Sequence, residues 1–120
     1  MNNITINKSG ESLGLWLLKI ITGALVIVLL FVHLAVNHFL APEGLLTYSE
    51  VVAYLSNPWI ALMEMTFLIV VVSHGLLGAR SILLDLKPSR GVLQAINISF
   101  LVLGIVSIVY GIWLIRVIVT

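Results

Sequence analysis

Three long apolar segments constrain this chain more than any other feature of its sequence. They cover about residues 13–40, 58–86 and 92–119. A helix needs roughly 20 mostly apolar residues to cross the hydrocarbon core of a bilayer, and each segment exceeds that length. Since backbone groups in hydrocarbon must be paired within the protein, each segment is predicted to form one membrane-spanning helix. The expected fold is therefore all-α, with three transmembrane helices.

The composition agrees with a membrane protein and excludes several classes of function. Of the 120 residues, 61% are hydrophobic and 9% are charged, whereas a soluble domain averages about 45–50% and about 25%. The formal net charge of +1 provides no basic field, so no nucleic-acid partner is expected. The chain has no cysteine, which excludes disulfides and thiolate metal sites. We expect a multi-pass protein of a cell membrane, inner or plasma, in contact with the lipid bilayer.

The chain divides into a polar N-terminal stretch, residues 1–12, and a three-helix anchor domain, residues 13–120. The N-terminal stretch lacks the basic-then-apolar order of a signal peptide, so the first span is expected to be retained. After the first span, "TYSEVVAYLSN" is predicted to form a short amphipathic helix on the membrane surface. Val51, Val52 and Leu55 would face lipid or protein, and Tyr48 and Tyr54 are expected at the surface.

Basic residues define the expected orientation. The loop between the second and third spans carries Lys87 and Arg90, and the N-terminal flank carries Lys8 and Lys19. The loop between the first two spans has acidic residues and no basic residue. The positive-inside rule therefore places the N-terminus and the second loop in the cytoplasm and the C-terminus outside.

Each predicted span has a stripe of polar or small residues at about 100° per residue. Such stripes are typical of helix faces that contact protein, and three of them are few for a closed bundle, so a partner subunit is expected. Glu64 lies about 80° from the stripe of the second span. The stripes comprise, on the first span, Lys19, Thr22, Val26, Leu29, His33 and Asn37; on the second, Phe67, His74, Gly78, Ser81 and Asp85; on the third, Asn97, Leu101, Gly104 and Gly111.

His33 and His74 are the stripe residues with the most distinctive chemistry. An imidazole in an apolar environment is costly unless it is bound. One interpretation is a hydrogen bond from each ring to a neighbouring helix. Two histidines on converging stripes favour haem ligation instead, because helix bundles hold cofactors between inward side chains. Gly78, one turn from His74, would leave room for a macrocycle, and His38 is expected to have an interfacial role.

The residues around these histidines resemble a known family. The stretch "SHGLLGARSILLDL" resembles the second helix of the membrane-anchor subunits of succinate:quinone oxidoreductases and fumarate reductases. That family carries His-x-x-x-Gly followed by an acidic residue, here His74, Gly78 and Asp85. The stretch "WLLKIITGALVIVLLFVHLAVNHF" resembles the first helix of anchors that hold two b-type haems. The resemblance covers about residues 13–116.

The resemblance implies a non-catalytic anchor subunit of succinate dehydrogenase or fumarate reductase. Its partners would be a flavoprotein subunit, an iron–sulfur subunit and a second membrane-anchor subunit. His74 would ligate a haem b nearer the cytoplasm and His33 a second haem b nearer the outer face, each iron being completed by the partner anchor. Gly78 and Asn37 would also contact haem. Quinone would bind near the cytoplasmic surface, where the chain has Lys19, Thr22, Arg80, Ser81 and Asp85.

Several points stay open at this stage. The arginine and the tyrosine of the family's quinone site cannot be carried over, because Ile20 and Leu86 stand at their places. One haem bound by both His33 and His74 is an alternative to two haems, and Arg80 could pair with Asp85. From a different class, a small proton-coupled transporter would use Glu64 as its carboxylate, although three spans and two inward histidines argue against it. A structural membrane peptide without a cofactor is the third possibility.

The predicted orientation can be tested with reporter fusions. A reporter inserted near Ser89 should report a cytoplasmic position, and one fused after Thr120 a position outside, because the basic residues flank the second loop. Alkaline phosphatase and green fluorescent protein fusions measure the two positions independently. The reverse pattern would contradict the orientation and would exchange the depths assigned to the two histidines.

Overall fold

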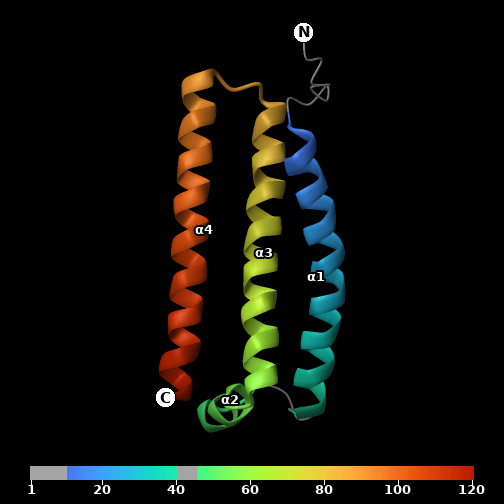
Figure 1. The fold of residues 1–120 in the computed structure, drawn as a ribbon, viewed down its shortest axis with the longest axis vertical. Helices are drawn as coiled ribbons and strands as arrows, with labels where there is room; N and C mark the ends of the chain where they lie inside the picture. Colours follow the sequence, from blue (N-terminus) through green and yellow to red (C-terminus); the bar gives the residue numbers. More distant parts are fainter. Residues whose placement is uncertain (1–10, 41–45) are drawn as a thin grey trace.

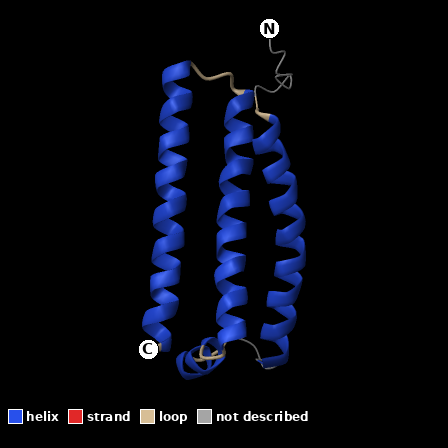
Figure 2. Ribbon diagram, viewed as in Figure 1, coloured by secondary structure: helices blue, strands red, loops and turns tan. Residues whose placement is uncertain are grey.

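A computed structural model of the chain describes residues 11–40 and 46–120, and within these ranges it contains four helices and no strand (Figure 2). The helices are α1 (Leu13–Leu40), α2 (Tyr48–Leu55), α3 (Pro58–Asp85) and α4 (Arg90–Val119). By length and composition, α1, α3 and α4 can each cross a membrane. The predicted all-α fold with three membrane-spanning helices is confirmed, and so is the predicted short helix α2.

Part of the sequence prediction concerns residues outside the described ranges. Of the polar N-terminal stretch predicted for residues 1–12, only Glu11 and Ser12 are described. Lys8, one of the basic residues behind the predicted orientation, lies outside the described residues. The orientation of the chain in the membrane therefore stays a prediction.

Local sequence chemistry explains where the helices begin and end. At the start of α3, Pro58 occupies the first turn and the side-chain oxygen of Asn57 accepts the backbone N–H of Trp59 at 3.0 Å. At the start of α4, the Ser89 hydroxyl accepts the N–H of Val92 at 3.4 Å. Between the two helices, Lys87 has a φ of 51°, the left-handed conformation that commonly ends a helix. The α3–α4 connection is consequently short and the two helices are antiparallel neighbours.

The long helices lie side by side with α3 in the middle (Figure 1). α3 packs against α1 on one side and against α4 on the other. The start of α1 and the α3–α4 connection lie at one end of the molecule, whereas α2 lies across the other end, near the C-terminus. The described residues thus form an elongated layer of 58 × 24 × 24 Å.

Small residues allow α4 to approach α3 closely. A Cβ on Gly104 would lie 3.0 Å from Cδ1 of Leu76, and a Cβ on Gly111 would overlap the side chain of Leu68. Both glycines belong to the stripe predicted for this helix, and small residues at helix contacts are typical of membrane bundles. Leu101, predicted for the same stripe, is instead 64% exposed.

Most apolar side chains of the long helices are exposed. Ile27 and Phe31 on α1, for example, are 72% and 73% exposed. Helices in lipid have no need to bury such faces against their own chain, since lipid tails and partner helices provide apolar surroundings. The described residues that are buried are few, and they are Glu11, Thr22, Tyr54, Leu55 and Gly104.

Candidate functional site

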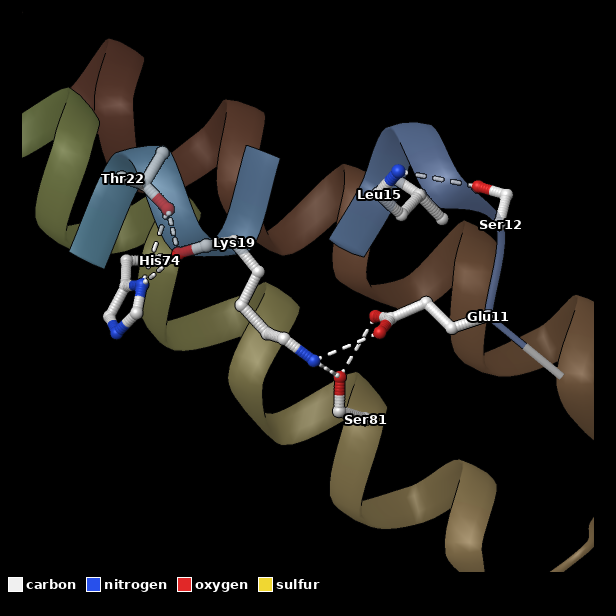
Figure 3. Close-up of polar contacts among 7 residues, drawn as sticks. All are labelled: Glu11, Ser12, Leu15, Lys19, Thr22, His74 and Ser81. Atoms are coloured by element: carbon white, nitrogen blue, oxygen red, sulfur yellow. Dashed lines mark hydrogen bonds and ion pairs between the residues drawn. The ribbon is translucent and has the colours of Figure 1, made fainter. Parts of the chain in front are cut away.

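The polar side chains between α1 and α3 form two clusters, one toward each end of the bundle. The Lys19 cluster consists of Glu11, Lys19, Thr22, His74 and Ser81, at the end that holds the α3–α4 connection (Figure 3). The Glu64 cluster lies at the α2 end and consists of His33, Asn37, Tyr54 and Glu64.

The core of the Lys19 cluster is a closed triangle of Glu11, Lys19 and Ser81 (Figure 3). The Lys19 ammonium lies 2.9 Å from Oε2 of Glu11 and donates to the Ser81 hydroxyl at 2.7 Å. That hydroxyl donates in turn to Oε1 of Glu11 at 2.9 Å. Burial raises the pKa of Glu11, but the hydrogen bonds from Lys19 and Ser81 and the nearby positive charges outweigh burial and hold this pKa below its ordinary value. The triangle ties the N-terminal flank and α1 to α3.

His74 is held against α1 through one of its two ring nitrogens. Its Nδ1 lies 3.2 Å from the backbone carbonyl oxygen of Lys19 and 3.2 Å from the hydroxyl oxygen of Thr22. Because a carbonyl oxygen can only accept, Nδ1 carries the hydrogen and donates it to Lys19. With the hydrogen on Nδ1, the lone pair of a neutral imidazole lies on Nε2, and Nε2 has no hydrogen bond to a described residue. A Cβ on Gly23 would lie 3.0 Å from Cε1 of His74, so glycine allows this close approach.

The α3 surface next to His74 is open. A Cβ added at Gly75 or at Gly78 would meet no described atom within 4 Å, outside the helix's own backbone. Gly78 lies one turn along α3 from His74 and therefore leaves the surface beside the ring unobstructed. Room for a macrocycle at Gly78 stays a prediction.

In the Glu64 cluster, a carboxylate collects donors from two other helices. Nδ1 of His33 on α1 lies 2.8 Å from both Oε1 and Oε2 of Glu64. The hydroxyl of Tyr54 on α2 donates to Oε1 of the same carboxylate. Asn37 donates to the Tyr54 hydroxyl oxygen at 3.1 Å and to the backbone oxygen of His33 at 2.8 Å. Burial and the neighbouring carboxylate raise the pKa of Tyr54, so its hydroxyl keeps its proton and acts as a donor.

His33 is thus held in the same way as His74. Its Nδ1 faces an acceptor on another helix, and its Nε2 has no hydrogen bond to a described residue. The ring also packs against Phe67, with 5.1 Å between ring centroids. A groove of about 450 Å³ lies beside the cluster, and its lining includes His33, Asn37, Tyr54, Leu68, Val71 and Gly111.

The two histidines lie at different depths in the layer. His74 contacts α1 at Lys19, Thr22 and Gly23. His33 lies ten residues beyond Gly23 on that helix, which is about 15 Å along the axis at ~1.5 Å per residue. The two imidazoles are therefore separated along the bundle, and the choice between one haem and two stays a prediction.

Other predicted site residues lie apart from these contacts. Arg80 donates to the side-chain oxygen of Asn97 on α4 at 2.7 Å, so the predicted pairing of Arg80 with Asp85 is not formed. Asp85 is exposed at the end of α3, and His38 is exposed near the end of α1. Of the residues predicted to bind quinone, the structure brings Lys19 and Ser81 into contact, places Thr22 next to them at His74, and leaves Arg80 and Asp85 outside the triangle.

Two members of the clusters were not predicted. Tyr54, expected at the surface, is 8% exposed because α2 turns this face toward α3 and α1, which makes the prediction wrong. A signal was available, since Tyr54 shares a helix face with Val51 and lies next to Leu55. Glu11 precedes the first helix, so helical periodicity gave no indication of its position.

Comparisons with known proteins find a matching family model and related proteins. A family model described as "Succinate dehydrogenase/Fumarate reductase transmembrane subunit" matches residues 2–114. A protein of Thermoplasma acidophilum, described as "Succinate dehydrogenase hydrophobic membrane anchor subunit", is 30% identical over 91 residues, which are 76% of this chain and 74% of that protein. A protein of Archaeoglobus fulgidus with the same description is 30% identical over 99 residues, which are 82% and 84% of the two chains. No solved structure matches significantly.

The Glu11 interactions predict a pH-dependent contribution to stability. Because the pKa of Glu11 is lowered in the folded state, its contribution is present above the ordinary value of 4.5 and is lost as the pH falls through the lower folded value. Glu11→Gln should therefore destabilise the protein by about 1–3 kcal/mol at pH 7, and the difference should vanish in acid. Thermal unfolding in detergent across this pH range measures it, with Asp85→Asn, at an exposed carboxylate that has no hydrogen bond to a described residue, as the control. Equal destabilisation at all pH values would contradict the ionised pair.

Proposed function

The chain belongs to the succinate dehydrogenase/fumarate reductase transmembrane subunit family, and on this premise we propose that it ligates haem b and helps to bind quinone. As a membrane anchor it is a non-catalytic part of an oxidoreductase complex. The proposed partners are a flavoprotein subunit, an iron–sulfur subunit and a second membrane-anchor subunit. Electrons from succinate would reach quinone through these partners, and this chain would provide docking, haem ligation and quinone contacts.

Haem ligation is supported by one feature that His33 and His74 share: Nδ1 of each ring faces a hydrogen-bond acceptor on another helix. Histidines that bind metals almost always donate their other ring N–H to a carboxylate or a backbone carbonyl. Nδ1 of His33 faces the Glu64 carboxylate, and Nδ1 of His74 faces the Lys19 carbonyl oxygen. Nε2 of each ring would then bind the iron of one haem b, which supplies one-electron redox chemistry when bound.

The surroundings of the two rings support a flat apolar group at each. The open α3 surface at Gly78 lies beside His74, and the groove beside His33 has Phe67, Leu68 and Val71 in its lining. Asn37 lines the same groove. The third histidine of the chain, His38, is exposed and on a different face of α1, so the second ligand of each iron would come from the partner anchor.

The Lys19 cluster supports quinone contacts at the other end of the bundle. A quinone presents two carbonyl oxygens, which accept hydrogen bonds, and it takes up protons when it is reduced. Lys19 uses two of its three N–H groups for Glu11 and Ser81, which leaves one donor between α1 and α3, and Glu11 provides a carboxylate beside it. Thr22, Arg80 and Asp85 lie at the same end of the layer and complete the proposed set.

A proton-coupled transporter that uses Glu64 is not favoured. The comparisons describe anchor subunits of succinate dehydrogenase. The Glu64 carboxylate is also bound by His33 and Tyr54, whereas a transporter needs a carboxylate that can exchange its partners for a substrate.

Removal of each histidine tests the haem proposal. His74→Ala and His33→Ala should each remove about one haem equivalent from the purified complex, or convert that haem to a high-spin form, because an axial ligand is lost. His38→Ala, the matched control, should keep both haems. The pyridine haemochrome assay per bound flavin and the optical spectrum measure content and spin state. Unchanged haem in both test variants would show that the rings serve only as hydrogen-bond donors.

The quinone proposal predicts a selective loss of activity. Lys19→Ala or Asp85→Asn should lower succinate:quinone reductase activity about tenfold or more, since a hydrogen bond to a charged group contributes about 1.5–3 kcal/mol. Activity with a water-soluble electron acceptor should stay intact, because it bypasses the membrane anchor. Lys87→Ala, an exposed lysine at the same end, is the control. A parallel fall of both activities would assign these residues to assembly instead.

A further inference from the structure

We propose that Glu64 is a positioning residue for the imidazole of His33, and that Tyr54 on α2 acts on this imidazole through Glu64. The inference rests on the proposed haem ligation by His33. It gives Glu64 a defined role in tuning that haem, and it makes the short surface helix α2 part of the haem site.

The contact geometry supports a positioning role. Nδ1 of His33 is equally distant, 2.8 Å, from the two oxygens of Glu64, so its hydrogen points at the carboxylate group as a whole. Phe67 packs against the same ring, with the ring planes inclined by 36°. A carboxylate on one side and a phenyl ring on another restrict both the position and the rotation of the imidazole.

The free-energy cost of a carboxylate inside a membrane-spanning helix supports a functional role for Glu64. Its side chain is only 13% exposed, and it lies six residues, or about 9 Å, inside α3 from Pro58. An ionised carboxylate in such surroundings is costly unless several donors bind it. Two helices supply these donors, His33 from α1 and Tyr54 from α2. Tyr54 on α2 thus binds one oxygen of the carboxylate, whereas His33 contacts both oxygens.

The arrangement has a defined electronic consequence. A carboxylate that accepts from Nδ1 makes Nε2 a more basic ligand, and a more basic ligand stabilises ferric iron over ferrous iron. Glu64 therefore lowers the midpoint potential of the haem on His33. Tyr54 withdraws part of the carboxylate's accepting capacity, so it opposes this effect, and Asn37 fixes Tyr54 by its hydrogen bond to the hydroxyl oxygen.

Two substitutions at Glu64 separate charge from orientation in the purified complex. Glu64→Gln removes the charge but keeps an acceptor oxygen, so the potential of one haem should rise by at least 59 mV, a tenfold change in its reduced-to-oxidised ratio. Its low-spin electron paramagnetic resonance signal should stay unchanged. Glu64→Leu removes the acceptor as well, so this signal should shift, or this haem alone should be lost while flavin and the other haem are retained. Thr66→Val, at an exposed residue of α3 whose hydroxyl donates to the backbone of its own helix, should change neither.

Tyr54 is tested through its dependence on Glu64. Tyr54→Phe should lower the potential of the same haem, because the carboxylate then accepts more strongly from His33. In the Glu64→Gln background, Tyr54→Phe should cause no further shift in the haem potential, because the carboxylate through which Tyr54 acts on His33 is absent. Tyr48→Phe is the matched control, as Tyr48 is 74% exposed on the same helix.

The outcomes distinguish this inference from the haem proposal itself. If the wild-type complex holds no haem on His33, the proposed function fails and the inference fails with it. If that haem is present but Glu64→Gln leaves its potential unchanged, or Glu64→Leu keeps the haem with an unchanged signal, the positioning role is wrong and haem ligation stands. Equal shifts from Tyr54→Phe in both backgrounds would refute the route through Glu64.

Discussion

The contact between α1 and α3 is the interaction on which the rest of the structure depends. An ionisable side chain inside a membrane is costly unless another group binds it, and this chain carries several of them on its first two spans. Lys19, His33 and His74 all find their partners across this one contact. The register between the two helices is consequently fixed by hydrogen bonds as well as by packing, and α4 joins through the glycine contacts with α3.

The two clusters each hold a histidine by the same kind of hydrogen bond, at two different depths. In each, a histidine is anchored through Nδ1 by an acceptor on this chain, a backbone carbonyl at His74 and a carboxylate at His33. The two acceptors differ in chemistry, so the rings are held alike by groups of different kind. The layer leaves its apolar faces exposed, as expected for a chain that meets both lipid and partner helices. Haem ligation, quinone contacts and the role of Glu64 are proposals that follow from this arrangement.

The sequence predicted the features that are determined within a single helix. Segment length gave the three spans, and the observed ends at Asp85 and Arg90 differ from the prediction by one and two residues. Periodicity gave the faces of α1 and α3 that meet, and the amphipathic pattern gave α2. These properties follow from local geometry alone.

The sequence did not predict what depends on how helices are aligned with one another. Periodicity places Glu64 off its stripe, yet the axial register brings it opposite His33. The same limit applies to Arg80, which reaches α4 and Asn97 rather than Asp85 on its own helix. Glu11 enters the Lys19 cluster from a non-helical flank, and Tyr54 enters the Glu64 cluster from a surface helix, so neither position follows from a helical repeat.

We propose that each histidine binds iron through Nε2 while its Nδ1 stays hydrogen-bonded within this chain. An experimental structure of the intact, purified complex at a resolution that defines imidazole rings tests this claim most directly. We expect two separate haems, one iron at Nε2 of His74 and one at Nε2 of His33, with Glu64 at Nδ1 of His33. A complex in which Nε2 of either histidine contacts only protein or lipid, or in which iron binds Nδ1, would contradict it.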